Sequence, residues 1–177
     1  MKKVYKIGTV NSIKTDYGLF KSLVDGSLLE VTAEQLEGVD NIRQNAFHYH
    51  SSIANITIPD SVTSIGNEAF SRCSKLINVT IGNGVTSIDA RAFSYCTSLT
   101  NVTIGNSVTS IGFYAFTNCS SLTRVIINAI LPPTIQSNTF QSCSSLNHII
   151  VPKGSGEAYK SATNWSAYAD IIKEAAE

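Results

Sequence analysis

The side chains best suited to chemistry in this chain are four thiols and an imidazole at nearly equal intervals. Cys73, Cys96, Cys119 and Cys143 follow His50 at steps of 23, 23, 23 and 24 residues. A thiol beside an imidazole is the pair found in cysteine nucleophiles and in zinc sites. Here, however, the even steps predict a line of side chains rather than a tetrahedron, and no two cysteines have the short separation of zinc motifs. In-register cysteines also suit disulfide geometry badly. We therefore interpret them as small buried hydrophobes, with a His50–Cys73 catalytic pair as the alternative.

The cysteines belong to a longer repeat. A phenylalanine stands three positions before His50 and before each cysteine, and an aliphatic residue stands three positions after. The phenylalanines are Phe47, Phe70, Phe93, Phe116 and Phe140. A period in this range is typical of a solenoid, in which one coil cannot bury its apolar face alone and stability comes from stacking.

One coil, residues 76–98, shows how the elements follow from the residues. The alternation of aliphatic and polar residues over 76–81 predicts a short strand with its aliphatic side chains inward. Glycine and asparagine over 82–84 predict a turn, because both accept positive φ at low cost. Residues 85–88 should direct two more aliphatic side chains inward, and the spacing within 92–96 fits a single helical turn.

Stacked strands place each residue over its counterpart one repeat away. We therefore expect inner ladders of phenylalanine, of leucine or isoleucine and of cysteine. On the outward face of the strands the expected ladders are Asn55, Asn78 and Asn101 beside Thr57, Thr80 and Thr103.

The units ITIPDSVTSIGNEAFSRCSKL, VTIGNGVTSIDARAFSYCTSL and VTIGNSVTSIGFYAFTNCSSL resemble the BspA-like leucine-rich repeats of bacterial surface proteins. The resemblance covers residues 39–152. It implies a repeat solenoid, an elongated right-handed stack of about five coils of 23 residues with a parallel β-sheet on one side. It also implies adhesion or recognition, with no catalytic residues.

The two ends of the chain differ from the repeat and are interpreted as caps. Residues 1–38 predict a strand over 4–13, a β-hairpin around Asp25-Gly26 and a short helix from Ala33 through Glu37. This section is a cap or an attachment module, and self-assembly through it is possible in the second case. Residues 153–177 predict a helical cap with helices over 157–162 and 165–173.

Composition narrows the classes of partner. The chain has 177 residues, a formal net charge of zero and 15% charged residues. No basic cluster points to nucleic acid, and no apolar run is long enough for membrane insertion. Residues 4–8 are not the apolar core of a signal peptide. We expect a cell-surface or extracellular location if a leader was removed, and otherwise a virion-associated or cytoplasmic one.

Candidate binding residues are the surface positions that vary between coils. Two groups stand out: outward strand positions, which change from asparagine and threonine to other types, and an aromatic flank beside the Ala-Phe pairs. The first group continues with Arg124, Ile126 and His148, and the second comprises Tyr95, Phe113 and Tyr114 with Tyr49. The alternative is neutral variation at tolerant sites.

The sequence contains none of the G-x-S-x-G, P-loop or H-E-x-x-H motifs, so we expect no enzyme, no cofactor and no metal. The leading hypothesis is a binding or adhesion module that recognises a host or extracellular protein or glycan. The alternative is a structural or receptor-binding component of a phage virion or similar assembly. An intracellular interaction scaffold is a third, weaker hypothesis.

Overall fold

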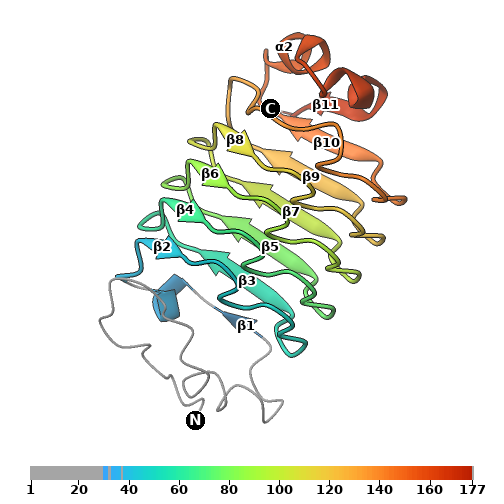
Figure 1. Ribbon diagram of the computed structural model, residues 1–177. Coiled ribbons are helices and arrows are strands. Elements are labelled where there is room, and N and C mark those ends of the chain that lie inside the picture. Colours follow the sequence, from blue (N-terminus) through green and yellow to red (C-terminus); the bar gives the residue numbers. More distant parts are fainter. Residues whose placement is uncertain (1–29, 32, 37, 177) are drawn as a thin grey trace.

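The computed structural model describes residues 30, 31, 33–36 and 38–176, which wind into stacked coils along one axis (Figure 1). The larger of two sheets has seven strands in the order β1-β3-β5-β7-β9-β10-β11. Its strands are β1 (Glu30–Val31), β3 (Asn55–Ile58), β5 (Asn78–Ile81), β7 (Asn101–Ile104), β9 (Arg124–Ile127), β10 (His148–Val151) and β11 (Ile172–Glu174). All of its pairings are parallel, as predicted for a stack of coils.

A second parallel sheet, which the sequence did not predict, lies on another side of each coil. Its strands have two residues each: β2 (Asn41–Ile42), β4 (Ser64–Ile65), β6 (Ser87–Ile88) and β8 (Ser110–Ile111). The inward aliphatic residues of this segment were predicted correctly, and Val85 and Ile88 are buried. Strands of two residues are too short to show a period of two in the sequence, so the pattern did not predict a sheet here.

The register between coils follows the sequence period. Asn55 pairs with Asn78 and Asn78 with Asn101, each one repeat of 23 residues further along. Within each four-residue strand the second and fourth side chains are buried, as the alternation of a strand requires. The prediction that counterparts lie directly over one another is confirmed.

The phenylalanines form a continuous stack through the core. Successive ring centroids from Phe47 to Phe140 are 4.8, 5.0, 5.2 and 5.4 Å apart, with interplanar angles of 10° or less. All five side chains are buried. The rings are nearly parallel because each coil repeats the backbone of the one before it. The predicted phenylalanine ladder is therefore present.

The carboxyl-terminal cap comprises α2 (Gly156–Ser161), the 3-10 helix η2 (Ser166–Ile171) and strand β11. The indole Nε1 of Trp165 donates to the Pro133 carbonyl oxygen at 2.7 Å, and its ring packs 6.2 Å from that of Phe140. The Tyr159 hydroxyl donates to the Ala129 carbonyl oxygen at 2.7 Å. The cap thus covers the last phenylalanine, as its apolar stripe predicts.

One prediction for this cap was wrong. Residues 165–173 do not form a single helix, because the chain becomes extended at Ile172 and pairs in parallel with β10. Ile172 lies in register with Ile149 and is buried. Continuing the sheet satisfies backbone groups of β10 that a helix would leave unpaired, so the tertiary pairing overrides the helical spacing.

One local prediction within the coil was also wrong, and another was right in part. Residues 91–95 form consecutive turns rather than the predicted single helical turn, and Arg91 and Tyr95 have φ values of 55° and 58°. The predicted turn is present at Asn83 and Gly84, but none of the residues 82–84 has positive φ. Glycine is used at Gly84 because a Cβ there would overlap with the carbonyl oxygen of Asp60 in the preceding coil.

The amino-terminal section is described only in part. The 3-10 helix η1 (Ala33–Leu36) occupies the place of the predicted short helix, and Leu36 is buried. The predicted strand over 4–13 and the turn at Asp25-Gly26 lie outside the described residues. Strand β1 pairs with β3, so the sheet begins before residue 39, where the repeat was expected to start. The domain boundaries stay predictions.

Phe93→Ala should lower the free energy of unfolding by about 3–5 kcal/mol, because it opens a cavity between two stacked rings. Urea melts followed by circular dichroism provide the measurement. Phe93→Leu retains most of the apolar volume and should cost less. If the alanine variant lost less than about 1 kcal/mol of unfolding free energy, the ring stack would not be a main source of stability, contrary to this prediction.

Candidate functional site

The thiols lie inside the solenoid and bond to the backbone. The cysteines are free, and the side chains of Cys73, Cys96 and Cys119 are buried. Their Sγ atoms donate to the carbonyl oxygens of Phe47, Phe70 and Phe93 at 3.0, 3.2 and 3.1 Å, each in the preceding coil. Sequence reasoning placed these side chains in the core but missed this ladder of hydrogen bonds.

The environment of Cys73 disfavours a reactive thiolate. Burial raises the pKa of the Cys73 thiol to about 12, because the charged form would lose its hydration. Partial burial also lowers the pKa of His50. The residues considered as a catalytic pair are thus a protonated thiol and a neutral imidazole at pH 7. Within residues 30–176 as described, no group of three or more histidine, cysteine or acidic side chains could hold a metal ion.

The outward residues of the larger sheet form one continuous surface, which we call the strand face. The Asn78 Nδ2 donates to Asn55 Oδ1 at 2.7 Å, and Asn101 Nδ2 donates to Asn78 Oδ1 at 3.0 Å. The registers place Arg124 beside Asn101, and His148 beside Arg124. The same registers form a second row of outward residues, in which the threonines of earlier strands are followed by the isoleucines of later ones. This row is Thr57, Thr80, Thr103, Ile126 and Ile150.

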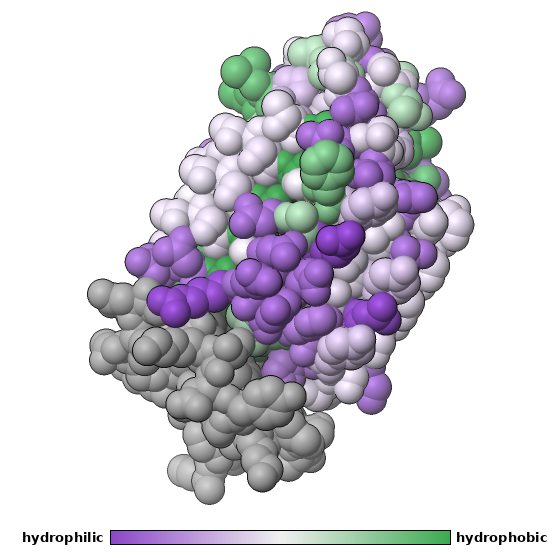
Figure 2. Space-filling model, viewed as in Figure 1, coloured by the Kyte–Doolittle hydropathy of each residue, from purple (hydrophilic) through white to green (hydrophobic). Residues whose placement is uncertain are grey.

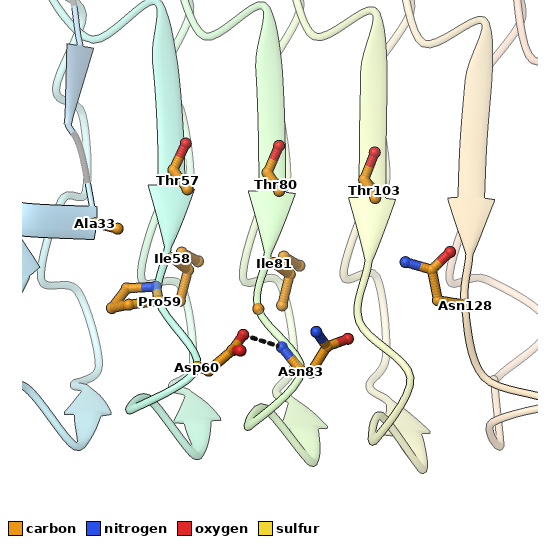
Figure 3. A pocket seen from close by; sticks show the side chains of 11 residues that line it. Ala33, Thr57, Ile58, Pro59, Asp60, Thr80, Ile81, Asn83, Thr103 and Asn128 are labelled. Atoms are coloured by element: carbon orange, nitrogen blue, oxygen red, sulfur yellow. Dashed lines mark hydrogen bonds between the residues drawn. The ribbon is translucent and has the colours of Figure 1, made fainter.

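A shallow groove of about 430 Å³ crosses the carboxyl ends of these strands (Figure 3). Thr57, Thr80 and Thr103 line it on successive coils, with Asp60 and Asn83 in the turns that follow. Asp60 Oδ1 accepts from the Asn83 backbone N–H at 2.6 Å. Hydroxyl, amide and carboxylate groups in a row offer both donors and acceptors to a polar ligand. The sequence predicted the threonines but not the turn residues. Asp60 and Asn83 come close to each other only because neighbouring coils stack.

The second candidate surface, which we call the flank, lies on the segments that lead from the smaller sheet back to the larger one. The guanidinium of Arg72 lies 4.5 Å from the ring centroid of Tyr95 and 5.3 Å from that of Tyr49. The Arg91 guanidinium lies 5.4 Å from the ring centroid of Tyr114. The sequence predicted the aromatic residues here but not the arginines between them, since the pairing joins residues one coil apart.

Three of the four flank aromatics are exposed, and the fourth is only partly so. The exposed fractions of Tyr49, Tyr95 and Phe113 are 63%, 42% and 53%, whereas Tyr114 is partly buried. Figure 2 shows hydrophilic side chains gathered in the middle of the face turned to the viewer, next to hydrophobic ones. Such a mixture of arginine, tyrosine and phenylalanine is typical of protein recognition surfaces.

The backbone of the flank has an unusual conformation for these residue types. Tyr49, Arg72 and Tyr95 occupy equivalent positions with φ values of 63°, 62° and 58°, and Arg91 and Tyr114 occupy another with 55° and 57°. A left-handed conformation costs a residue with a Cβ about 1–2 kcal/mol, and an exposed cation–π contact returns only about 0.5–1 kcal/mol. The backbone N–H groups of Arg72 and Arg91 donate to the carbonyl oxygens of Ser94 and Phe113 in the next coil at 2.8 and 2.9 Å, so the left-handed conformation is part of the hydrogen bonding between coils.

The described residues include no helix of the length and apolarity that crossing a membrane requires.

Comparison with known proteins identifies the family. The sequence profile of the BspA type leucine rich repeat region matches residues 40–167 in six copies, one more than the sequence suggested. The chain belongs to this family. No curated protein matches it.

Similar solved structures are bacterial leucine-rich repeat proteins. The leucine rich repeat protein of T. pallidum (TpLRR) is 29% identical with a TM-score of 0.64, over 70% of this chain and 58% of that one. A leucine rich cell surface protein of Faecalibacterium prausnitzii is 28% identical with a TM-score of 0.64, over 84% of this chain and 36% of that one. The pneumococcal vaccine antigen PcpA, 14% identical with a TM-score of 0.62 over 84% of this chain and 42% of that one, shares the fold. The chain thus spans less than two thirds of each.

The buried thiols should resist alkylation. At pH 8 the thiolate fraction of Cys73 should be on the order of one in ten thousand, because its pKa is about 12. Iodoacetamide followed by mass spectrometry should leave the peptides of Cys73, Cys96 and Cys119 unmodified in the folded protein and modify all of them in urea. Rapid labelling of Cys73 without urea would contradict its burial.

Proposed function

We propose that this chain is a non-catalytic binding or adhesion module that recognises a host or extracellular protein or glycan through the solenoid surface. One observation carries the proposal: exposed side chains differ between coils whose buried residues are nearly constant. Arg124, for example, takes the register position of Asn101. A scaffold of repeated coils can vary such positions without disturbing its core, which suits it to recognition.

The comparisons support this proposal. The chain belongs to the BspA type family, and the related F. prausnitzii structure is described as a leucine rich cell surface protein. We therefore propose a location at the bacterial surface. Self-assembly through residues 1–38 stays a prediction, because most of that section lies outside the described part of the chain.

Two surfaces are available for the ligand, and their chemistry differs. The groove on the strand face offers the hydroxyls of Thr57, Thr80 and Thr103. The flank offers exposed aromatic rings and arginines. A glycan would use the former, through hydrogen bonds to its hydroxyl groups, and a protein would use the latter.

Arrays of extracellular matrix proteins and of glycans, probed with the labelled full chain, test the proposal. We expect at least one specific ligand, confirmed by a dissociation constant in solution. Two variants then distinguish the surfaces. The groove variant combines Thr57→Val, Thr80→Val and Thr103→Val, and the flank variant combines Arg72→Asn and Arg91→Asn. One of the two should weaken binding at least tenfold. Valine keeps the shape and strand preference of threonine without its hydroxyl.

No ligand above the background of an unrelated protein, or chemical conversion of the ligand by the chain, would overturn the proposal. A ligand held equally well by both variants would place recognition outside the surfaces named here and would contradict their assignment.

A further inference from the structure

We propose that the flank is a docking surface for an acidic segment of a partner protein, whose carboxylates pair with Arg72 and Arg91 while its apolar side chains contact the exposed rings. This inference deepens the proposed function and rests on it. It names one surface and one class of partner.

Arginine and tyrosine occupy flank positions whose left-handed backbone favours asparagine. The coils of Phe47, Phe70, Phe93 and Phe116 have left-handed residues at both flank positions, whereas the coil of Phe140 has one, at Ser142. Asparagine serves there in other coils, as Asn118 does two coils after Arg72 and Asn45 does two coils before Arg91. Asparagine tolerates this conformation better than arginine or tyrosine. Core packing does not compensate, because the side chains of Arg72 and Arg91 are exposed. The left-handed backbone itself belongs to the stack, since the N–H groups of Arg72 and Arg91 donate to the carbonyl oxygens of Ser94 and Phe113 in the next coil. The stack therefore explains the conformation but not the use of arginine in place of asparagine, and costly residues at such positions are characteristic of binding surfaces.

Neighbouring aromatic rings hold the guanidiniums of the flank. Rings on both sides of Arg72 fix its position, at 4.5 and 5.3 Å from their centroids. In the described part of the chain neither Arg72 nor Arg91 forms an ion pair, and the Glu68 carboxylate lies 3.8 Å from Nδ1 of His48 instead. A guanidinium stacked on a ring still has its N–H edge for a planar, bidentate carboxylate.

The charge and the exposed rings of the flank indicate the kind of partner. The connecting segments that carry the flank hold four basic side chains, Arg43, Arg72, Lys75 and Arg91, against Glu68 and Asp89. This small excess of positive charge complements a few carboxylates but is far from the dense basic patch that a sulfated polysaccharide requires. The exposed ring of Phe113 adds apolar contact area, and arginine with aromatic residues is the usual composition of protein hot spots.

The test uses three probes with the full chain: a random copolymer of glutamate and tyrosine, polyglutamate, and a heparin oligosaccharide of similar charge. Arg72→Asn with Arg91→Asn removes the guanidiniums and keeps the backbone conformation that other coils already have with asparagine. The control, Lys160→Ala with Lys173→Ala, removes two positive charges from the carboxyl-terminal cap. Dissociation constants are measured by fluorescence anisotropy at physiological salt, and thermal melts check folding.

We expect the copolymer to bind more tightly than polyglutamate or heparin. Its dissociation constant should rise at least fivefold in the double asparagine variant and less than twofold in the control, and the melting temperature of the asparagine variant should not fall. Arg72→Lys should weaken binding to an intermediate degree, because a lysine cannot pair in the bidentate manner.

Equal loss in the two double variants, preference for heparin, or no binding of the copolymer would overturn this inference. A ligand found on the arrays that is lost only in the threonine variants would overturn it too, and would leave the proposed function standing.

Discussion

The structure depends on one constraint: each coil must lie in register over the one before it, at the spacing of parallel strands. The phenylalanine rings meet this constraint with centroid separations of 4.8–5.4 Å. The thiols meet it as well, since each of three buried cysteines donates to a carbonyl oxygen of the preceding coil. A coil alone has nothing to receive these contacts, so the stack is the smallest unit that is stable.

The same constraint creates the surfaces. In-register stacking makes neighbours of residues that are 23 positions apart in the chain, whether they are of the same type or of different types. Asparagines then bond in a row on the strand face. On the flank an arginine is held between two tyrosines of neighbouring coils. The arrangement of the surface thus depends on the same geometry that stabilises the interior, while exposed side chains differ between coils whose buried residues are nearly constant.

The carboxyl-terminal cap shows how the last coil of the stack is covered. Ile172 continues the sheet by one strand, and Trp165 covers the last phenylalanine while its indole bonds to the Pro133 carbonyl oxygen. The helical spacing of residues 165–173 predicted a helix throughout. The pairing of β11 with β10 prevails over that spacing, because an unpaired parallel strand would leave its backbone groups without partners.

The sequence alone determined the solenoid, its period and its core, since residues such as Phe93 and Cys96 recur at positions that only a stack of coils can bury. It also located the strand face, because outward positions alternate with inward ones. Only the tertiary structure decided the second sheet, the left-handed turns, the thiol–carbonyl bonds and the pairing of Arg72 with Tyr49 and Tyr95. These features arise between coils, where the distance along the chain is large and the local pattern carries no signal of which atoms will meet.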